Sequence, residues 1–220
     1  TSSSDQVVDF LHAAAVYSDM VQLDTLFTTS KNNTAYYAIL SKAGVTNAQE
    51  ALQEGLPIVY LQGNIHAGEV EAKEALMLLI RAIITGPKAY LLDHQILLIA
   101  PNYNPDGNDK LSDKHRRSQE HCPHRVGTRR SGGDYDLNRD GVKVEAIETQ
   151  GLFRNILLKW DPMLVVDMHT TNGTWHANHL TYAPSYHSAG HAATSQYTKE
   201  VLLPQVQYNM LHKHQLNTDS

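Results

Sequence analysis

The chain has 220 residues, of which 41% are hydrophobic and 19% are charged, and its formal net charge is −5. This length suits one sizeable α/β domain rather than two, and the negative charge offers no basic surface to nucleic acid. The apolar stretches fall short of the ~20 residues that cross a bilayer, so we expect no membrane span. From the length we expect a single domain over residues 1–220.

Helical and strand periodicities alternate along the first half of the chain. They predict, in order, a helix at 5–18 capped by Ser4 or Asp5, a hairpin of strands at 21–28 and 35–41, a short helix at 48–54, a strand at 58–61 and a helix at 70–85. Glu71 and Glu74 are expected to point along this last helix, away from its start.

The second half continues the alternation. It predicts a buried strand at 95–100, a turn at 101–107, an exposed loop at 108–133, a helix at 144–160, a strand at 163–169 and a helix at 192–212. Strands that alternate with helices predict an α/β fold, with a mixed, mostly parallel sheet and helices on both faces. Such sheets bind ligands beyond the carboxyl ends of their strands.

His66 occupies the predicted turn from the strand at 58–61 into the next helix, and Glu69 lies in the first turn of that helix. The three-residue step brings an imidazole and a carboxylate to the same side, and this pair suits Zn²⁺ if a third ligand arrives from elsewhere. A His-x-x-Glu pair is common by chance, so the pair alone is only a hypothesis.

His169 ends the strand at 163–169 and is the natural third ligand. Asp167 shares its face of the strand, where a carboxylate can orient an imidazole as metal-bound histidines require. The alternative is a hydrogen-bonded histidine at a strand end. The polar residues 170–173 that follow favour the first interpretation, because they suit the wall of a site.

A cluster of polar side chains follows the predicted loop. It consists of Asp136, Asn138 and Arg139, preceded by Arg129 and Arg130. Guanidinium groups bind carboxylates bidentately, and an asparagine amide completes such a cradle. The alternative is a solvated charged turn. Beside a metal site, the cluster predicts an anion clamp for a substrate.

Four motifs occur in a distinctive order: His66-x-x-Glu69, Asn-Pro-Asp-Gly at 104–107, Asp-Leu-Asn-Arg at 136–139, and His169 at a strand end. Together they resemble the zinc carboxypeptidase family over about residues 57–184, and look most like a bacterial secreted branch. The resemblance therefore implies a secreted or periplasmic protein.

The resemblance also implies a role for each matched residue. One Zn²⁺ per chain would be bound by His66, Glu69 and His169. Asp136 would contact His66 without being a ligand of the metal itself. Arg129 would polarise the scissile carbonyl, with Arg130 as the substitute if the loop lengths differ. Asn138 and Arg139 would hold the terminal carboxylate of the substrate.

Two features depart from the better-known digestive members of that family. Gly68 stands where they carry an arginine before the metal-binding glutamate, so a substrate contact is missing. Their general-base glutamate lies well downstream of the third ligand, whereas here Glu200 falls in a predicted helix and is expected to face solvent. We therefore expect the catalytic domain to be incomplete at its C-terminus, with the general base after residue 220.

A second metal site is not expected. His115, His121, Cys122 and His124 match no structural zinc spacing, and they lie in the predicted loop.

The leading prediction is a zinc-dependent hydrolase of peptide or peptide-like amide bonds, of carboxypeptidase type. Its substrate would be a peptide or acylated amino acid with a free carboxylate. One alternative is an N-acyl amino acid deacylase of the aspartoacylase and desuccinylase type, although the Asn-Pro-Asp-Gly and Asp-Leu-Asn-Arg motifs favour a peptidase. Another is a catalytically incomplete, zinc-containing binding module, which the intact ligand triad opposes.

Overall fold

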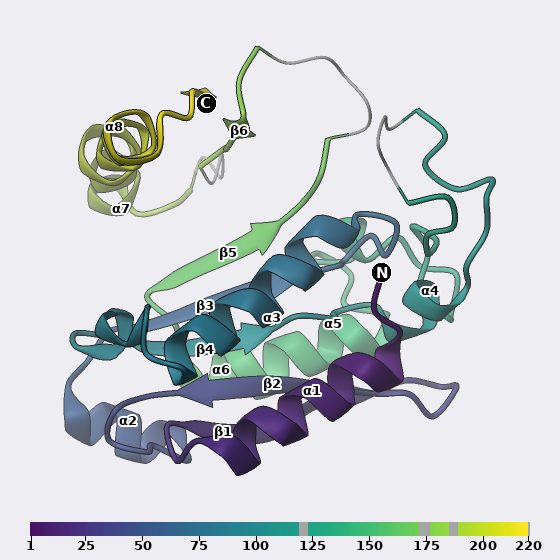
Figure 1. The fold of residues 1–220 in the computed structure, drawn as a ribbon, viewed down its shortest axis with the longest axis horizontal. Coiled ribbons are helices and arrows are strands. Elements are labelled where there is room, and N and C mark those ends of the chain that lie inside the picture. The colour runs from purple at the N-terminus through teal and green to yellow at the C-terminus, as the bar shows by residue number, and fades with distance from the viewer. Residues whose placement is uncertain (119–122, 172–176, 185–188, 220) are drawn as a thin grey trace. The chain divides into compact units, whose positions relative to one another are not determined.

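A computed structural model describes residues 1–118, 123–171, 177–184 and 189–219 (Figure 1). The chain forms two compact units, Thr1–Asn172 and Gly173–Ser220. The single domain over 1–220 stays a prediction.

The first unit is built on a five-stranded sheet in the order β1-β2-β4-β3-β5. The strands are β1 (Val21–Thr28), β2 (Thr34–Leu40), β3 (Ile58–Gly63), β4 (Ile96–Ala100) and β5 (Leu164–Met168). Strand β3 pairs in parallel with β4 and β5, whereas β1–β2 and β2–β4 are antiparallel. The predicted mixed α/β sheet is therefore confirmed, with its pairings divided equally between the two kinds rather than mostly parallel.

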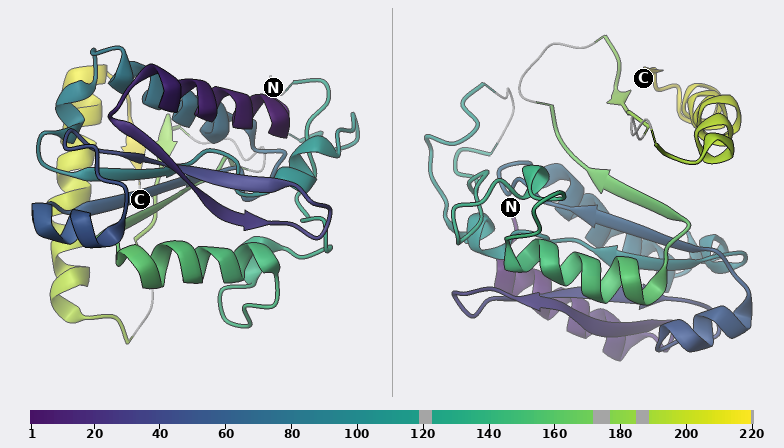
Figure 2. Two further views of the ribbon diagram at one scale, coloured as in Figure 1. Left: turned by 90° about the horizontal axis from the view of Figure 1, so that it is seen from below. Right: turned by 180° about the vertical axis from the view of Figure 1, so that it is seen from behind.

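Helices α1 (Ser4–Tyr17) and α3 (Val70–Ile84) cover one face of this sheet (Figure 2). Their apolar stripes, which include Leu11 and Ile80, form one buried cluster with Leu40 and Ile99 of the strands. The cap of α1 is Ser3 rather than the predicted Ser4 or Asp5, and a reciprocal bond with Gln6 forms a capping box. A short 3₁₀ turn, η1 (Ala89–Leu92), leads from α3 into β4.

The opposite face carries α2 (Ala48–Glu54) and a continuous helical run of α5 (Ile147–Leu152), the π-helical η3 (Phe153–Leu157) and α6 (Leu158–Trp160) (Figure 2). Trp160 Nε1 donates to Tyr37 Oη at 2.9 Å in the core on this side. The predicted start of this helix at 144 is wrong. Asp140 instead accepts bonds from the backbone N–H groups of Glu145 and Ala146, at 3.0 and 2.9 Å.

The segment after β4 differs from the predicted turn. Residues Pro105–Asp109 form a short helix, α4, and Asn104 caps it by accepting a bond from Gly107 N at 2.9 Å. Within the loop that follows, Ser112 and Val126 form an isolated antiparallel bridge, and the buried Val126 departs from a fully exposed loop. A 3₁₀ turn, η2 (Leu137–Arg139), ends the loop.

The second unit contains a helical run of α7 (Ala192–Tyr197), the π-helical η4 (Thr198–Leu202) and α8 (Leu203–His214), where the sequence predicts one helix. Two short strands, β6 (Leu180–Thr181) and β7 (Thr218–Asp219), pair in parallel. Glu200 is exposed, as expected. In the described ranges, every helix is too short or too polar to cross a membrane.

Candidate metal centre

The turn between β3 and α3 carries His66 and Glu69, which are 3% and 2% exposed. Glu69 N donates to His66 O at 2.8 Å, which closes the turn. Glu69 is the N-cap residue of α3 and not, as predicted, a residue of its first turn, and its side chain makes no cap bond. Its carboxylate instead turns to His66, with Oε1 at 2.8 Å from Nδ1.

His169 follows directly after β5, and β5 lies beside β3 in parallel. The turn after β3 and the end of β5 therefore meet at one edge of the sheet. His169 Nδ1 lies 3.0 Å from Glu69 Oε2, and Thr170 N donates to the same oxygen at 2.9 Å. Among the described residues, His66, Glu69 and His169 form the one group whose ligand atoms all lie within 4.8 Å of one another.

The outer nitrogens of both histidines face carboxylates. His66 Nε2 lies 3.4 Å from Asp136 Oδ1, and His169 Nε2 lies 2.8 Å from Asp167 Oδ2. Such partners fix the ring orientation of metal-bound histidines and leave the other nitrogen for the metal. Two imidazole nitrogens and a carboxylate oxygen, all turned inward, form a donor set that fits Zn²⁺.

The ionisable side chains of the site shift one another's pKa values. Burial pushes the pKa of Glu69 up, but hydrogen bonds from His169, His66 and Thr170 N, and the charge of Arg116, hold it well below its ordinary value. The bonds to Asp167 and Glu69 raise the pKa of His169 to about 9. The carboxylate of Glu69 is therefore ionised at neutral pH and available as a ligand.

Arg116 is a residue of this site that sequence reasoning missed. Its Nη2 donates to Glu69 Oε1, and its side chain is 11% exposed. The aliphatic part crosses Gly68, where a Cβ would lie 2.8 Å from Arg116 Cγ. Gly68 therefore leaves the space that this side chain fills. Gly68 was the one feature of the sequence that could have indicated a side chain packed over this turn, but a glycine in a turn has many explanations.

Replacing Arg116 with glutamine is expected to tighten zinc binding roughly tenfold. A zinc ion bound by Glu69 would share the carboxylate with the guanidinium, and a hydrogen bond to a charged group contributes roughly 1.5–3 kcal/mol. Competition with a chromophoric chelator measures the affinity. Arg117→Gln, next in the chain, is the control and should match wild type. Weaker binding by the Arg116 variant would instead mean that Arg116 holds Glu69 in place.

Arg129 also reaches the centre. Its Nε donates to Asp136 Oδ2 at 2.9 Å, and Nη1 lies 3.3 Å from His66 Nδ1. Burial pushes the pKa of Asp136 up, but the bond and charge of Arg129 outweigh it and lower this pKa. The predicted substitute, Arg130, is exposed and donates to Asp134 O within its own loop at 3.0 Å.

The predicted carboxylate-binding residues lie in the turn that follows Asp136. Asn138 and Arg139 are exposed in the 3₁₀ turn that follows Asp136, and Arg139 Nη1 donates to Asn138 O at 2.8 Å. They adjoin the centre through Asp136.

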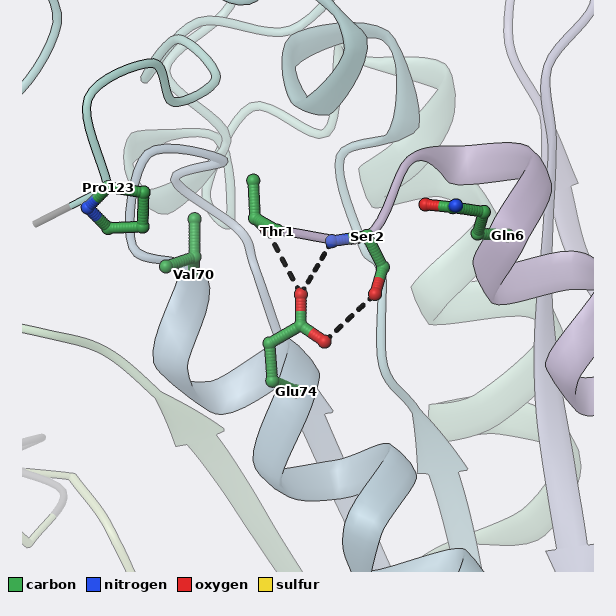
Figure 3. Close-up of a pocket in the computed structure, with 6 residues that line it drawn as sticks. All are labelled: Thr1, Ser2, Gln6, Val70, Glu74 and Pro123. Carbon is green, nitrogen blue, oxygen red and sulfur yellow. Dashed lines mark hydrogen bonds between the residues drawn. The ribbon is translucent and has the colours of Figure 1, made fainter.

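The first glutamates of α3 do not point as predicted. Glu71 Oε2 accepts a bond from Thr170 Oγ1 at 2.7 Å, beside His169. Glu74 turns to the N-terminal residues and accepts bonds from Thr1 and Ser2, in a small pocket (Figure 3).

The four residues that match no structural zinc spacing lie partly outside the described residues. His121 and Cys122 lie outside the described residues. His115 Nδ1 lies 3.1 Å from the carbonyl oxygen of Val126, and His124 is exposed.

Two histidines and a buried glutamate, set at the carboxyl ends of parallel strands in a mixed α/β sheet, form a candidate metal centre with the donor set of zinc-dependent hydrolases. Comparison with known proteins narrows the class. The profile described as zinc carboxypeptidase matches residues 7–205, and the chain belongs to that family.

Individual relatives are distant. Carboxypeptidase 2 of Trichophyton rubrum is 26% identical over 113 residues, which are 50% of this chain and 18% of that protein. Bovine thrombin-activatable fibrinolysis inhibitor has a similar fold, with a TM-score of 0.64 and 17% identity over 99% of this chain and 75% of that chain. A metallo-carboxypeptidase from Burkholderia cenocepacia has a TM-score of 0.58 and 18% identity over 77% of this chain and 41% of that one.

Proposed function

We propose that this chain binds one zinc ion through His66, Glu69 and His169, and that it serves in the hydrolysis of peptide or peptide-like amide bonds of carboxypeptidase type. The observation that carries the proposal is the inward orientation of the three donors, with Asp136 and Asp167 behind the two imidazoles. Family membership supports zinc as the metal.

The chemistry that a zinc ion supplies in such a site is activation of water and polarisation of a carbonyl. The side chains around it would orient the substrate. Arg129, held by Asp136 beside His66, carries a positive charge to where a carbonyl oxygen would become negative. Asp136 thus fixes both a zinc-binding histidine and the arginine that faces the reacting group.

Asn138 and Arg139 would bind the terminal carboxylate of the substrate. Both are exposed, and both follow Asp136 in the chain, so their polar groups can meet a ligand that reaches the centre from solvent. A guanidinium and an amide together match the two oxygens of a carboxylate.

Arg139→Ala is expected to weaken the binding of a short peptide to the zinc-loaded protein by roughly 1.5–3 kcal/mol, the scale of a hydrogen bond to a charged group. Isothermal titration calorimetry measures this difference. Arg81→Ala, an exposed arginine in the last turn of α3, is the matched control and should bind as wild type does.

The same peptide with an amidated C-terminus tests what Arg139 recognises. It should bind weakly to wild type and to the Arg139 variant alike. Equal binding of the free and amidated peptides by wild type would refute carboxylate recognition. An N-acetylated amino acid that binds more tightly than any peptide would favour the deacylase over the peptidase.

A further inference from the structure

Lys73 is a buried cation that the proposed chemistry does not use. It lies one helical turn after Glu69 on α3, and it is fully buried. Its Nζ donates to Asn108 Oδ1 at 2.5 Å and to Ser2 O at 2.6 Å, and the closest acid in an ion pair, Glu74, is 3.9 Å away. Burial lowers the pKa of Lys73 to about 8. Burying an ammonium group is costly, so its contacts deserve a functional explanation.

These contacts lead to the turn that carries the metal ligands. Asn108 Oδ1, which accepts from Lys73, also accepts from Asn64 Nδ2 at 3.1 Å. Asn64 Nδ2 donates in addition to Asn102 Oδ1 at 2.7 Å. Asn64, Asn102 and Asn108 are all buried. One buried network therefore joins α3 to the segments that follow β3 and β4.

Asn64 is the residue that this network holds. It follows β3, precedes His66 by two residues, and has a left-handed backbone with φ of 66°. That conformation costs a non-glycine residue roughly 1 kcal/mol or more and persists where the surroundings enforce it. Both hydrogens of the Asn64 amide are used to enforce it here.

We propose that Lys73 is a positioning residue for the zinc site. Through Asn108 it fixes Asn64, and through Asn64 it fixes the turn that presents His66 relative to the helix that begins at Glu69. The two ligands from this turn are then held at the separation that zinc requires, before a metal arrives. The inference rests on the proposed zinc site, because it concerns how that site is held.

Three variants separate positioning from simple stabilisation. Lys73→Met keeps the length of the side chain and removes its charge and donors. Asn64→Gly adopts the left-handed backbone without steric strain and removes the side chain that carries the amide. Ile80→Ala, in the buried cluster further along α3, is the control, because it destabilises the core without touching the network.

Zinc affinity is measured by chelator competition on protein shown to be folded by circular dichroism, and the visible spectrum of the Co²⁺-substituted protein reports the ligand geometry. Lys73→Met and Asn64→Gly should each lose about tenfold or more in zinc affinity, as for other supporting residues around metal ligands, and should shift the Co²⁺ spectrum. Ile80→Ala should lower the melting temperature and leave both readouts unchanged.

The outcomes distinguish positioning of the zinc ligands from simple stabilisation of the fold. Wild-type affinity and spectrum in folded Lys73→Met or Asn64→Gly would overturn the inference, as would an equal loss in Ile80→Ala. If Lys73→Met does not fold, Asn64→Gly decides. If wild type itself binds no zinc, the proposed function fails and the inference fails with it, whereas zinc binding by wild type with no effect of the variants refutes the inference alone.

Discussion

Replacing both His66 and His169 with alanine is expected to reduce zinc content from about one ion per chain to almost none. The two imidazoles supply two of the three donors, and Glu69 alone cannot hold a zinc ion against water. The measurement is elemental analysis of protein purified without chelator. In a thermal melt, added zinc should raise the melting temperature of wild type and not of the double variant.

The matched control removes two exposed histidines elsewhere, His94 and His212, and should keep the full zinc content. Full occupancy in the His66, His169 double variant would place the metal at other residues. Loss of zinc from the control would point to the same conclusion.

Gly127→Ala is expected to destabilise the protein by about 2–4 kcal/mol and to weaken zinc binding with it. A Cβ at Gly127 would lie 2.5 Å from Gly107 O and 2.8 Å from Ala67 O. Both are backbone atoms, so they can move only if the turn before α3 or the helix α4 shifts. Denaturant unfolding measures the loss of stability, and chelator competition measures the loss of zinc affinity.

The control is Gly141→Ala. A Cβ there meets no atom within 4 Å, and its φ is not positive, so the free energy of unfolding should change by less than about 0.5 kcal/mol. If Gly127→Ala were as stable as this control, the close packing of Gly127 against the metal-binding turn would be disproved.

The positions of the strands and of most helices could be predicted from the sequence, because each has a regular apolar pattern and clear turn residues. The structure places β3, α3, β4 and β5 within a few residues of the prediction. The start of α5 could not be predicted, because Asp140 holds the backbone N–H groups of Glu145 and Ala146 in a loop that precedes the helix. The short helix that begins at Pro105 could not be predicted either, because Asn-Pro-Asp-Gly suits both a turn and a capped helix.

The candidate site could be predicted as far as it depends on short motifs next to strands. His66, Glu69 and His169 meet because parallel neighbours end at one edge of the sheet. Arg116 and Lys73 could not be predicted. Arg116 reaches Glu69 from a loop without regular pattern, and Lys73 occupies a helix position where a lysine is ordinarily exposed. Only the tertiary fold brings them to the site.

The passage of Arg116 over Gly68 has a consequence for how this site can change in evolution. Any side chain at position 68 would clash with the side chain of Arg116, so an arginine gained there would displace the Arg116 guanidinium from Glu69. The two positions are therefore expected to covary among homologues: a small residue at 68 where the loop supplies the cation, and a loop residue without charge where position 68 supplies it. An intermediate with both arginines would crowd two like charges around one carboxylate, which makes the route that gains the second arginine before losing the first unfavourable.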